Sequence, residues 1–359
     1  MFQSNNRVIH ILYTFLIAIA GGFLFSLLHI PVPWLLGPMV FIMLINNLTK
    51  YTLDWNSRLR NIGLFIVGYT FGTTMTNETI KVVFQQLPYM LLMTIVLMVF
   101  CFIIALTLAK ISNIDYDSAF LASVPGGLSQ VLVLAEETKG VNITIVTVTQ
   151  VIRVMMVVSV MPFLVLLPLF QNNEAETSVT TAVSTTTSHF SFVSLFVFLF
   201  VSIGVTYVFI KIKFPVAYLL GPMFATAILQ IFWTMGPEVP IQLTDLAQLL
   251  IGVHVGKMLQ FSALPNKSKV LLFAITNGAI LIFFAFLLSN VLSLLQPLDH
   301  ATTLLSLAPG GADQMGVIAH AIHADLSIVS SYQIFRLFLI NFAVAPFIAW
   351  MYNRRKNKG

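Results

Sequence analysis

The sequence predicts an all-α protein that crosses a membrane many times and consists of two homologous halves. The chain has 359 residues, of which 58% are hydrophobic and 9% charged, whereas soluble domains carry about 25% charged residues. Its longest apolar runs reach the roughly 20 residues that a transmembrane helix needs, as at 87–109, 192–210 and 270–295. A chain this poor in charge would not cover a soluble surface, so we expect a polytopic membrane protein.

Four motifs occur twice in the same order, which indicates an internal duplication. Three recur after 184 residues and the fourth after 183, as if one residue had been deleted between them. In the longest pair, seven of ten residues are identical. The pairs are IPVPWLLGPM (30–39) with FPVAYLLGPM (214–223), VPGGLSQ (124–130) with APGGADQ (308–314), Gly68-Tyr-Thr-Phe-Gly72 with Gly252-Val-His-Val-Gly256, and Gln150-Val-Ile-Arg153 with Gln333-Ile-Phe-Arg336.

A polar linker at 171–189 separates the first repeat, residues 1–170, from the second, residues 190–359. Each half has six hydrophobic segments, and the fifth is interrupted by Pro-Gly-Gly, which continuous helices avoid. This segment either crosses the membrane, which makes the halves parallel, or dips in and returns, which makes them inverted repeats of five spans plus one re-entrant segment. The segments are 7–28, 34–49, 58–76, 84–109, 117–138 and 142–169, then 190–210, 217–233, 244–260, 269–294, 301–323 and 326–351.

Loop charges favour the inverted arrangement. With the N-terminus inside and the fifth segment re-entrant, most loop cations become cytoplasmic, as the positive-inside rule expects, and the Lys-free linker lies outside. We therefore predict a bacterial cytoplasmic membrane, both termini cytoplasmic, and a first span that is retained rather than cleaved. The predicted cytoplasmic cations are Arg7, Lys50, Arg58, Arg60, Lys110, Lys139, Lys211, Lys213, Lys267, Lys269 and the RRKNK tail.

The two helix breaks are the first candidate site. A break frees backbone groups that hydrocarbon cannot satisfy, so such backbone must be buried in protein or line a polar cavity. The half-helix after each Gly pair points its positive end at the break, where an anion is favoured. The alternative is a packing kink that lets helices approach closely. The residues are Pro125, Gly126, Gly127, Ser129 and Gln130, and Pro309, Gly310, Gly311, Asp313 and Gln314.

Arg153 and Arg336 form the second candidate site, with Gln150 and Gln333 one turn earlier on the same helix face. Each arginine lies about eleven residues into its span, near the middle of a bilayer core about 30 Å thick. An arginine at this depth needs a partner or a watery cavity. It either recognises an anion or forms a structural ion pair, such as Arg336 with Asp313.

Asp313 distinguishes the halves, because its counterpart is Ser129. It either binds a coupling H⁺ or Na⁺ or permanently neutralises Arg336. For His254 we expect a packed core histidine, with proton coupling as the alternative.

Four further residues carry simpler predictions. Pro38 and Pro222 are expected at the first position of a helix. The pair His320 and His323 provides two ligands at a surface, and we expect no metal site there.

These paired motifs resemble the AbrB-type duplicated membrane protein family of bacteria, over nearly the whole chain. The resemblance implies a membrane protein of two homologous halves without an established substrate. Members carry labels such as "transcriptional regulator" and "ammonia monooxygenase". The broken-helix plan is also similar in outline to cation–proton antiporter and bile-acid symporter folds, an analogy of fold that names no cargo.

Together these patterns predict a secondary transporter of a small anionic organic solute that works by alternating access at a midplane site. We expect no enzyme activity, no cofactor and no nucleic-acid partner, with the lipid bilayer as surroundings. H⁺ or Na⁺ coupling, a homo-oligomer and a channel remain open. The alternatives are an indirect role in regulating gene expression, since no DNA-binding unit fits in the loops, and a membrane monooxygenase, which would need clustered His and carboxylate ligands.

Overall fold

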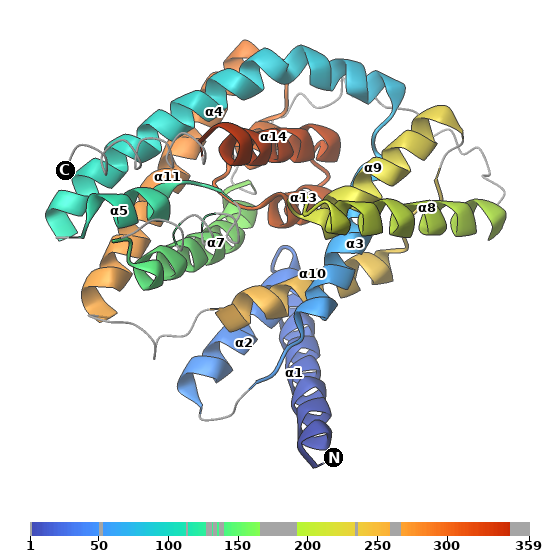
Figure 1. Cartoon of the computed structure of the whole chain (residues 1–359), viewed down its shortest axis with the longest axis horizontal. Coiled ribbons are helices and arrows are strands. Elements are labelled where there is room, and N and C mark those ends of the chain that lie inside the picture. Colours follow the sequence, from blue (N-terminus) through green and yellow to red (C-terminus); the bar gives the residue numbers. More distant parts are fainter. Residues whose placement is uncertain are drawn as a thin grey trace.

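The computed structural model describes residues 2–49, 53–112, 114–126, 131, 135, 140–165, 192–233, 236–258 and 267–344, and the regular structure in these residues is helical (Figure 1). The α-helices of the first half are α1 (Phe2–Leu27), α2 (Pro33–Leu48), α3 (Ser57–Thr73), α4 (Asn77–Ser112), α5 (Tyr116–Ser123) and α7 (Ile143–Val165). Those of the second half are α8 (Phe192–Lys211), α9 (Ala217–Phe232), α10 (Ile241–Met258), α11 (Lys267–Leu295), α12 (His300–Leu307), α13 (Ala312–Ala321) and α14 (Leu326–Leu339), followed by the π-helix η3 (Ile340–Val344).

The helices have the length and surface of a membrane protein, which confirms the predicted class of a helical, polytopic membrane protein. Among the described residues, six helical stretches are long and apolar enough to cross a bilayer, in α1, α4, α7, α8, α11 and α14 with η3, and α2 and α9 are shorter apolar helices. Large apolar side chains face outward, for example Phe200 at 81% and Leu294 at 86% exposure, while Gln150 and Gln333 are buried. This inverted distribution suits a hydrocarbon solvent.

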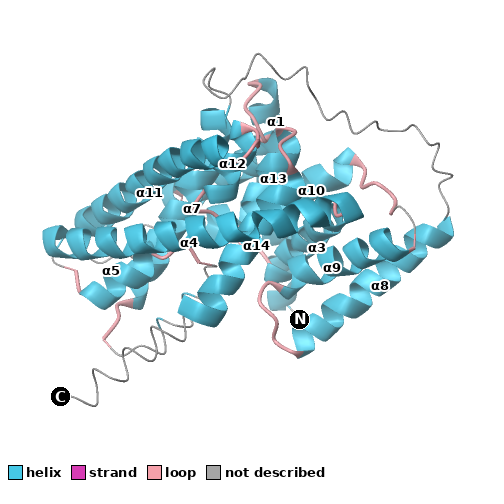
Figure 2. Ribbon diagram, turned by 90° about the horizontal axis from the view of Figure 1, so that it is seen from above, coloured by secondary structure: helices cyan, strands magenta, loops and turns pink. Residues whose placement is uncertain are grey.

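The helices pack into two units that each combine helices from both halves. We call α1–α3 with α8–α10 the LLGPM unit, and α4, α5, α7 and α11–α14 the Pro-Gly-Gly unit. Figures 1 and 2 both show α3, α8 and α9 on one side and α5 and α11 on the other, with α13 and α14 between them. The main contacts between the units join α3 to α13 and α14, and α10 to α7.

Glycines hold the LLGPM unit together by letting helices of opposite halves touch. A side chain at Gly252 or Gly256 of α10 would overlap with backbone carbonyls of α2, those of Leu35 and Met39. Gly68 and Gly72 of α3 make the matching contacts with α9, at Leu219 and Met223. Such close approach is the usual role of small residues at membrane helix interfaces.

The glycine inside each LLGPM motif serves the opposite face of its helix. Gly37 of α2 packs against the backbone of Gly21 in α1, and Gly221 of α9 packs against Thr206 in α8. Each LLGPM helix is thus held between the preceding helix of its own half and the Gly-x-x-x-Gly helix of the other half. This double contact explains why the chain contains the motif twice.

The prediction for Pro38 and Pro222 is wrong. Both lie inside their helices, which begin five residues earlier, after Val32 and Val216 in the left-handed backbone region. A positive φ is unfavourable for a β-branched residue, so these turns are held by their surroundings. A proline in the second turn removes only one helix hydrogen bond, and this permits the helix to start earlier than the motif suggested.

The helices of the second half follow those of the first at the spacing of the motifs, from α2 and α9 to α5 and α12. Whether the halves are inverted in the membrane stays a prediction. The linker 171–189 lies outside the described residues, and so do Gly127, Ser129 and Gln130.

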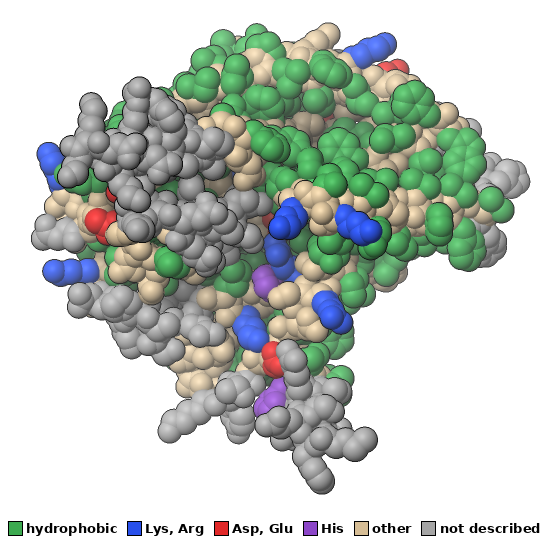
Figure 3. All heavy atoms as spheres, in the orientation of Figure 1, with side chains coloured by type: hydrophobic (Ala, Val, Ile, Leu, Met, Phe, Trp, Pro, Cys, Tyr) green, Lys and Arg blue, Asp and Glu red, His purple; other side chains and the backbone are tan. Residues whose placement is uncertain are grey.

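Figure 3 shows one face of the molecule, where a broad hydrophobic surface borders a group of Lys, Arg and His side chains.

Candidate functional site

The first helix break is capped by the glutamine and arginine of α7. The Gln150 side chain donates hydrogen bonds from Nε2 to the carbonyls of Leu121, Ala122 and Val124, at 2.8, 3.2 and 3.0 Å. Arg153 donates from Nη1 to the Val124 carbonyl at 2.9 Å and from Nη2 to Gln150 Oε1 at 2.5 Å. These donors satisfy carbonyls that the end of α5 leaves without helical partners.

The second break has the same cap, built by α14. Gln333 Nε2 donates to the carbonyls of Leu305, Ser306 and Ala308, at 2.7, 3.3 and 3.1 Å. Arg336 donates to the Ala308 carbonyl at 2.9 Å, to the Gly310 carbonyl at 2.8 Å and to Gln333 Oε1. A guanidinium at this position also compensates the negative end of α12.

Both arginines are buried, with Arg153 at 1% and Arg336 at 4% exposure. With the glutamines, they donate hydrogen bonds to backbone carbonyls at the breaks that would otherwise be unpaired inside a membrane. The proposed ion pair between Arg336 and Asp313 is wrong, because Asp313 pairs instead with Arg60, between Nη2 and Oδ2 at 3.9 Å. Substrate binding by Gln150, Arg153, Gln333 and Arg336 stays a prediction. In this structure their side chains line no part of the cavity described next.

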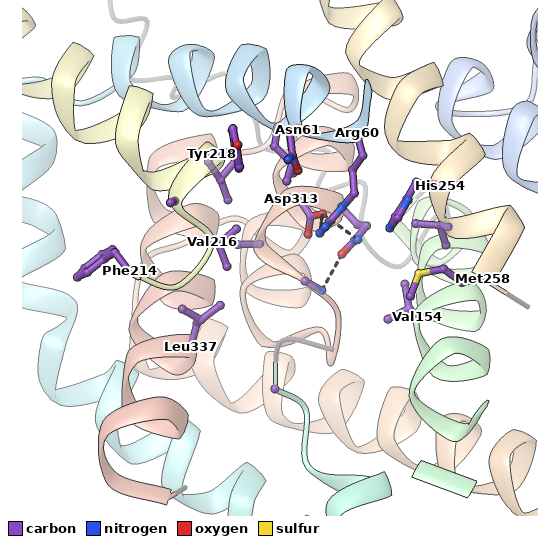
Figure 4. A pocket seen from close by; sticks show the side chains of 18 of the residues that line it. Arg60, Asn61, Val154, Phe214, Val216, Tyr218, His254, Met258, Asp313 and Leu337 are labelled. Atoms are coloured by element: carbon purple, nitrogen blue, oxygen red, sulfur yellow. Dashed lines mark hydrogen bonds and ion pairs between the residues drawn. The ribbon is translucent and has the colours of Figure 1, made fainter. Parts of the chain in front are cut away.

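A cavity of about 410 Å³ lies where the two units meet (Figure 4). It combines residues from both breaks, from both units and from the turn between α8 and α9. Its wall is apolar with a few polar groups that converge, as in typical small-molecule sites. The lining residues are Arg60, Asn61, Leu64, Gly126, Val151, Val154, Ile210, Lys213, Phe214, Val216, Ala217, Tyr218, Leu219, His254, Val255, Met258, Gly311, Ala312, Asp313, Gln314 and Leu337.

Asp313 stands at the first turn of α13, directly after the second break. The Gln314 side chain fixes this turn, because its Oε1 accepts from the Gly311 backbone N–H at 2.9 Å and its Nε2 donates to Asp313 Oδ2 at 3.1 Å. In Figure 4 the Arg60 side chain extends from α3 toward Asp313 across the cavity, with His254 beside it. A carboxylate at a helix N-terminus is stabilised by the helix dipole.

The cavity therefore contains some of the predicted site residues and not others. Gly126, Gly311, Asp313 and Gln314 line it. Pro125, Pro309 and Gly310 belong to the breaks without lining it. His254, expected as a packed core residue, faces the cavity from α10.

Sequence reasoning missed Arg60, Asn61, Lys213 and Tyr218 as site residues. From the sequence, Arg60 and Lys213 were recognised only as loop cations. Loop charges predict on which side of a membrane a residue lies, but not the direction of its side chain. The left-handed backbone at Lys213 and Val216 brings the turn between α8 and α9 to the cavity. The signal available in the sequence was the Phe214-Pro-Val turn directly before the second LLGPM motif.

The described residues contain no group of three or more His, Cys, Asp or Glu side chains that could hold a metal ion. His320 stands at the end of α13, and His323 follows it in the turn to α14, with positive φ.

Fold and site together define a helical, polytopic membrane protein with a charged cavity between two helical units. The chain belongs to the AbrB family, as the paired motifs predicted: the family model described as "Transition state regulatory protein AbrB" matches residues 34–352. It is similar to "Uncharacterized protein YhjN" of Bacillus subtilis (strain 168), with 23% identity over an alignment 377 positions long that covers 99% of this chain and 97% of the relative. It is also similar to "Putative regulator AbrB" of Escherichia coli (strain K12), with 26% identity over 332 residues that cover 90% and 92% of the two chains.

Proposed function

We propose that the protein is a secondary transporter that carries a small anionic organic solute across the cytoplasmic membrane by alternating access. The observation that carries this proposal is the position of the cavity. It lies between two units and is lined by the backbone of both helix breaks, at Gly126 and Gly311. Secondary transporters with repeated halves bind their substrates at such a junction of discontinuous helices.

The charges of the cavity favour an anion. Arg60 and Lys213 contribute two cations, whereas Asp313 is the only carboxylate among the lining residues. The volume of about 410 Å³ falls within the usual range for small-molecule sites. A solute with one or two carboxylate groups and a short carbon skeleton suits both the charge and the size.

The division into two units supports a moving site. Glycine-mediated backbone contacts tie the LLGPM unit together, and the Gln–Arg caps tie α7 and α14 to the breaks in the Pro-Gly-Gly unit. The main contacts between the units are confined to α3 and α10 on one side and α7, α13 and α14 on the other. Relative motion of the units would open the cavity alternately to each side of the membrane, with the caps preserving the shape of both breaks.

Topology tests the inverted repeat on which this mechanism rests. A single cysteine placed at Ser184 in a Cys101→Ser background is expected to react with a membrane-impermeant maleimide in intact cells, because the linker lies outside. Protection in intact cells, followed by labelling after lysis, would place the linker in the cytoplasm and make the halves parallel.

Transport itself is tested with purified protein in liposomes. We expect uptake of at least one radiolabelled short-chain mono- or dicarboxylate above the level of empty liposomes, saturating with concentration and accelerated by unlabelled acid inside. Uptake that shows no such trans-acceleration and no saturation would indicate a channel.

The regulatory names have a consistent explanation. The family description and the name of the relative from E. coli contain the words "regulatory" and "regulator". A transporter affects gene expression indirectly when it changes the internal concentration of a solute. No observation on the described residues favours a monooxygenase.

A further inference from the structure

The pair Arg60–Asp313 differs in kind from the other polar contacts of the site, because it connects the two units. Arg60 belongs to α3 of the LLGPM unit, and Asp313 belongs to α13 of the Pro-Gly-Gly unit. The ion pair between Lys257 and Asp54, with Nζ and Oδ1 at 3.2 Å, lies within the LLGPM unit. Relative motion of the units must therefore stretch or break Arg60–Asp313 and leaves Lys257–Asp54 intact.

The geometry leaves Arg60 available to a second anion. Its Nη2 lies 3.9 Å from Asp313 Oδ2, longer than the roughly 2.7–2.9 Å of a charge-assisted hydrogen bond. The Arg60 side chain is 30% exposed and that of Asp313 is 10% exposed. A guanidinium has five donors in a planar fork, so a carboxylate in the cavity can bind Arg60 in two-pronged geometry beside Asp313.

Two carboxylates on one arginine repel each other, and one proton removes the conflict. The other titratable groups that line the cavity with Asp313 are His254 on α10, Tyr218 on α9 and Lys213 before α9, whereas α7 and α14 contribute Val151, Val154 and Leu337. Arg60 is the ion-pair partner of Asp313. Protonation of Asp313 lets the entering carboxylate replace it at Arg60 without a change in the net charge of the cavity.

We propose, building on the proposed function, that Arg60 is the substrate-carboxylate receptor and Asp313 the proton carrier, so that the protein moves one carboxylate together with one proton. In the empty state Asp313 occupies the carboxylate position on Arg60 and holds the units in register. Substrate and proton together release this contact, because RCOO⁻ takes the place of Asp313 while Asp313 becomes the neutral acid. Substrate alone would leave Arg60 facing two carboxylates and a proton alone would leave it facing none, which couples the two fluxes.

The duplicated sequence predicts the stoichiometry. At the position 184 residues from Arg60 stands Thr244, and the counterpart of Asp313 is Ser129. Neither residue of the Arg60–Asp313 pair is therefore repeated at the corresponding position of the other half. One pair in two halves predicts one proton for each carboxylate.

Binding and its pH dependence test this proposal. The probe is a panel of sodium salts of straight-chain mono- and dicarboxylic acids with two to six carbons, measured by thermal shift in detergent against sodium chloride at equal concentration. Above the titration range of Asp313, binding must take up one proton, so the Kd is expected to rise about tenfold for each pH unit. Asp313→Asn is expected to bind with a Kd independent of pH, and Arg60→Gln to lose binding.

Transport into liposomes provides a second measurement, which would not change if the role of Asp313 were merely structural. Asp313→Asn is expected to retain exchange of labelled for unlabelled carboxylate but to lose accumulation driven by a pH gradient. The control is Asp245→Asn, a carboxylate on the second turn of α10 outside the cavity lining, which should keep both activities.

The outcomes separate this proposal from the proposed function. Carboxylate binding and uptake that are independent of pH in the unmodified protein, or accumulation that requires a Na⁺ gradient, overturn proton coupling and leave a transporter of anions. Failure of every acid in the panel to bind at any pH overturns both. Binding that survives in Arg60→Gln overturns the role of Arg60 alone.

Discussion

The two helix breaks share their framework and differ in their chemistry. Gln150 with Arg153 and Gln333 with Arg336 make corresponding hydrogen bonds to carbonyls 25 to 29 residues earlier in the chain. By contrast, the Arg60–Asp313 contact has no counterpart in the duplicated positions. The features present twice hold the structure, and this contrast supports our proposal that the feature present once carries the specific task of the site.

Removal of a cap should have the largest effect on stability. Arg336→Met leaves the buried Gly310 carbonyl without its donor, at a cost of about 1–3 kcal/mol, and removes one of the donors to the Ala308 carbonyl and the partner of Gln333 Oε1. We expect a large loss of folded protein in thermal melts followed by size-exclusion chromatography. Arg153→Met should behave similarly, because it is the same cap in the other half.

Arg58→Met is the control for these variants, since it makes the same substitution at an exposed position at the start of α3 and should change stability little. Normal stability of Arg336→Met would contradict the capping role and leave substrate binding as the remaining prediction for Arg336.

Widening a glycine contact should have an intermediate effect. Gly252→Leu and Gly68→Leu force α10 from α2 and α3 from α9, and overpacking of this kind costs about 1–3 kcal/mol. Gly204→Leu is the matched control, because a Cβ atom at Gly204 of α8 would meet no atom of a neighbouring helix within 4 Å. Equal melting temperatures for Gly252→Leu and Gly204→Leu would show that the crossing of the LLGPM helices is not a tight contact.

The ion pair present once should contribute least to stability. Its partners are 3.9 Å apart and the Arg60 side chain is 30% exposed, so a coupling free energy below about 1 kcal/mol is expected from its geometry. A double-mutant cycle of Arg60→Gln and Asp313→Asn by thermal unfolding measures it. A coupling of several kcal/mol would make the pair part of the framework and remove the distinction between the two classes of feature.

Much of the framework could be predicted from the sequence. Apolar runs predicted the helices, and the repeated motifs marked the breaks and the arginines that cap them. The sequence does not show which groups those arginines bind. The carbonyls that they bind belong to a different helix, and only tertiary packing brings them close. Asp313 was recognised by its difference from Ser129, but its partner Arg60 was not, since a cation near a helix start resembles any cytoplasmic loop charge until the neighbouring helix is placed.

The central claim is that the cavity between the two units opens to both sides of the membrane in turn. Val154 lines it from α7, so a single cysteine there, in a Cys101→Ser background, reports access with a membrane-impermeant maleimide. We expect labelling in inside-out vesicles and, separately, in right-side-out vesicles, with protection in both by a carboxylate that the protein binds. Labelling confined to one side under all conditions would contradict alternating access and leave a fixed pocket.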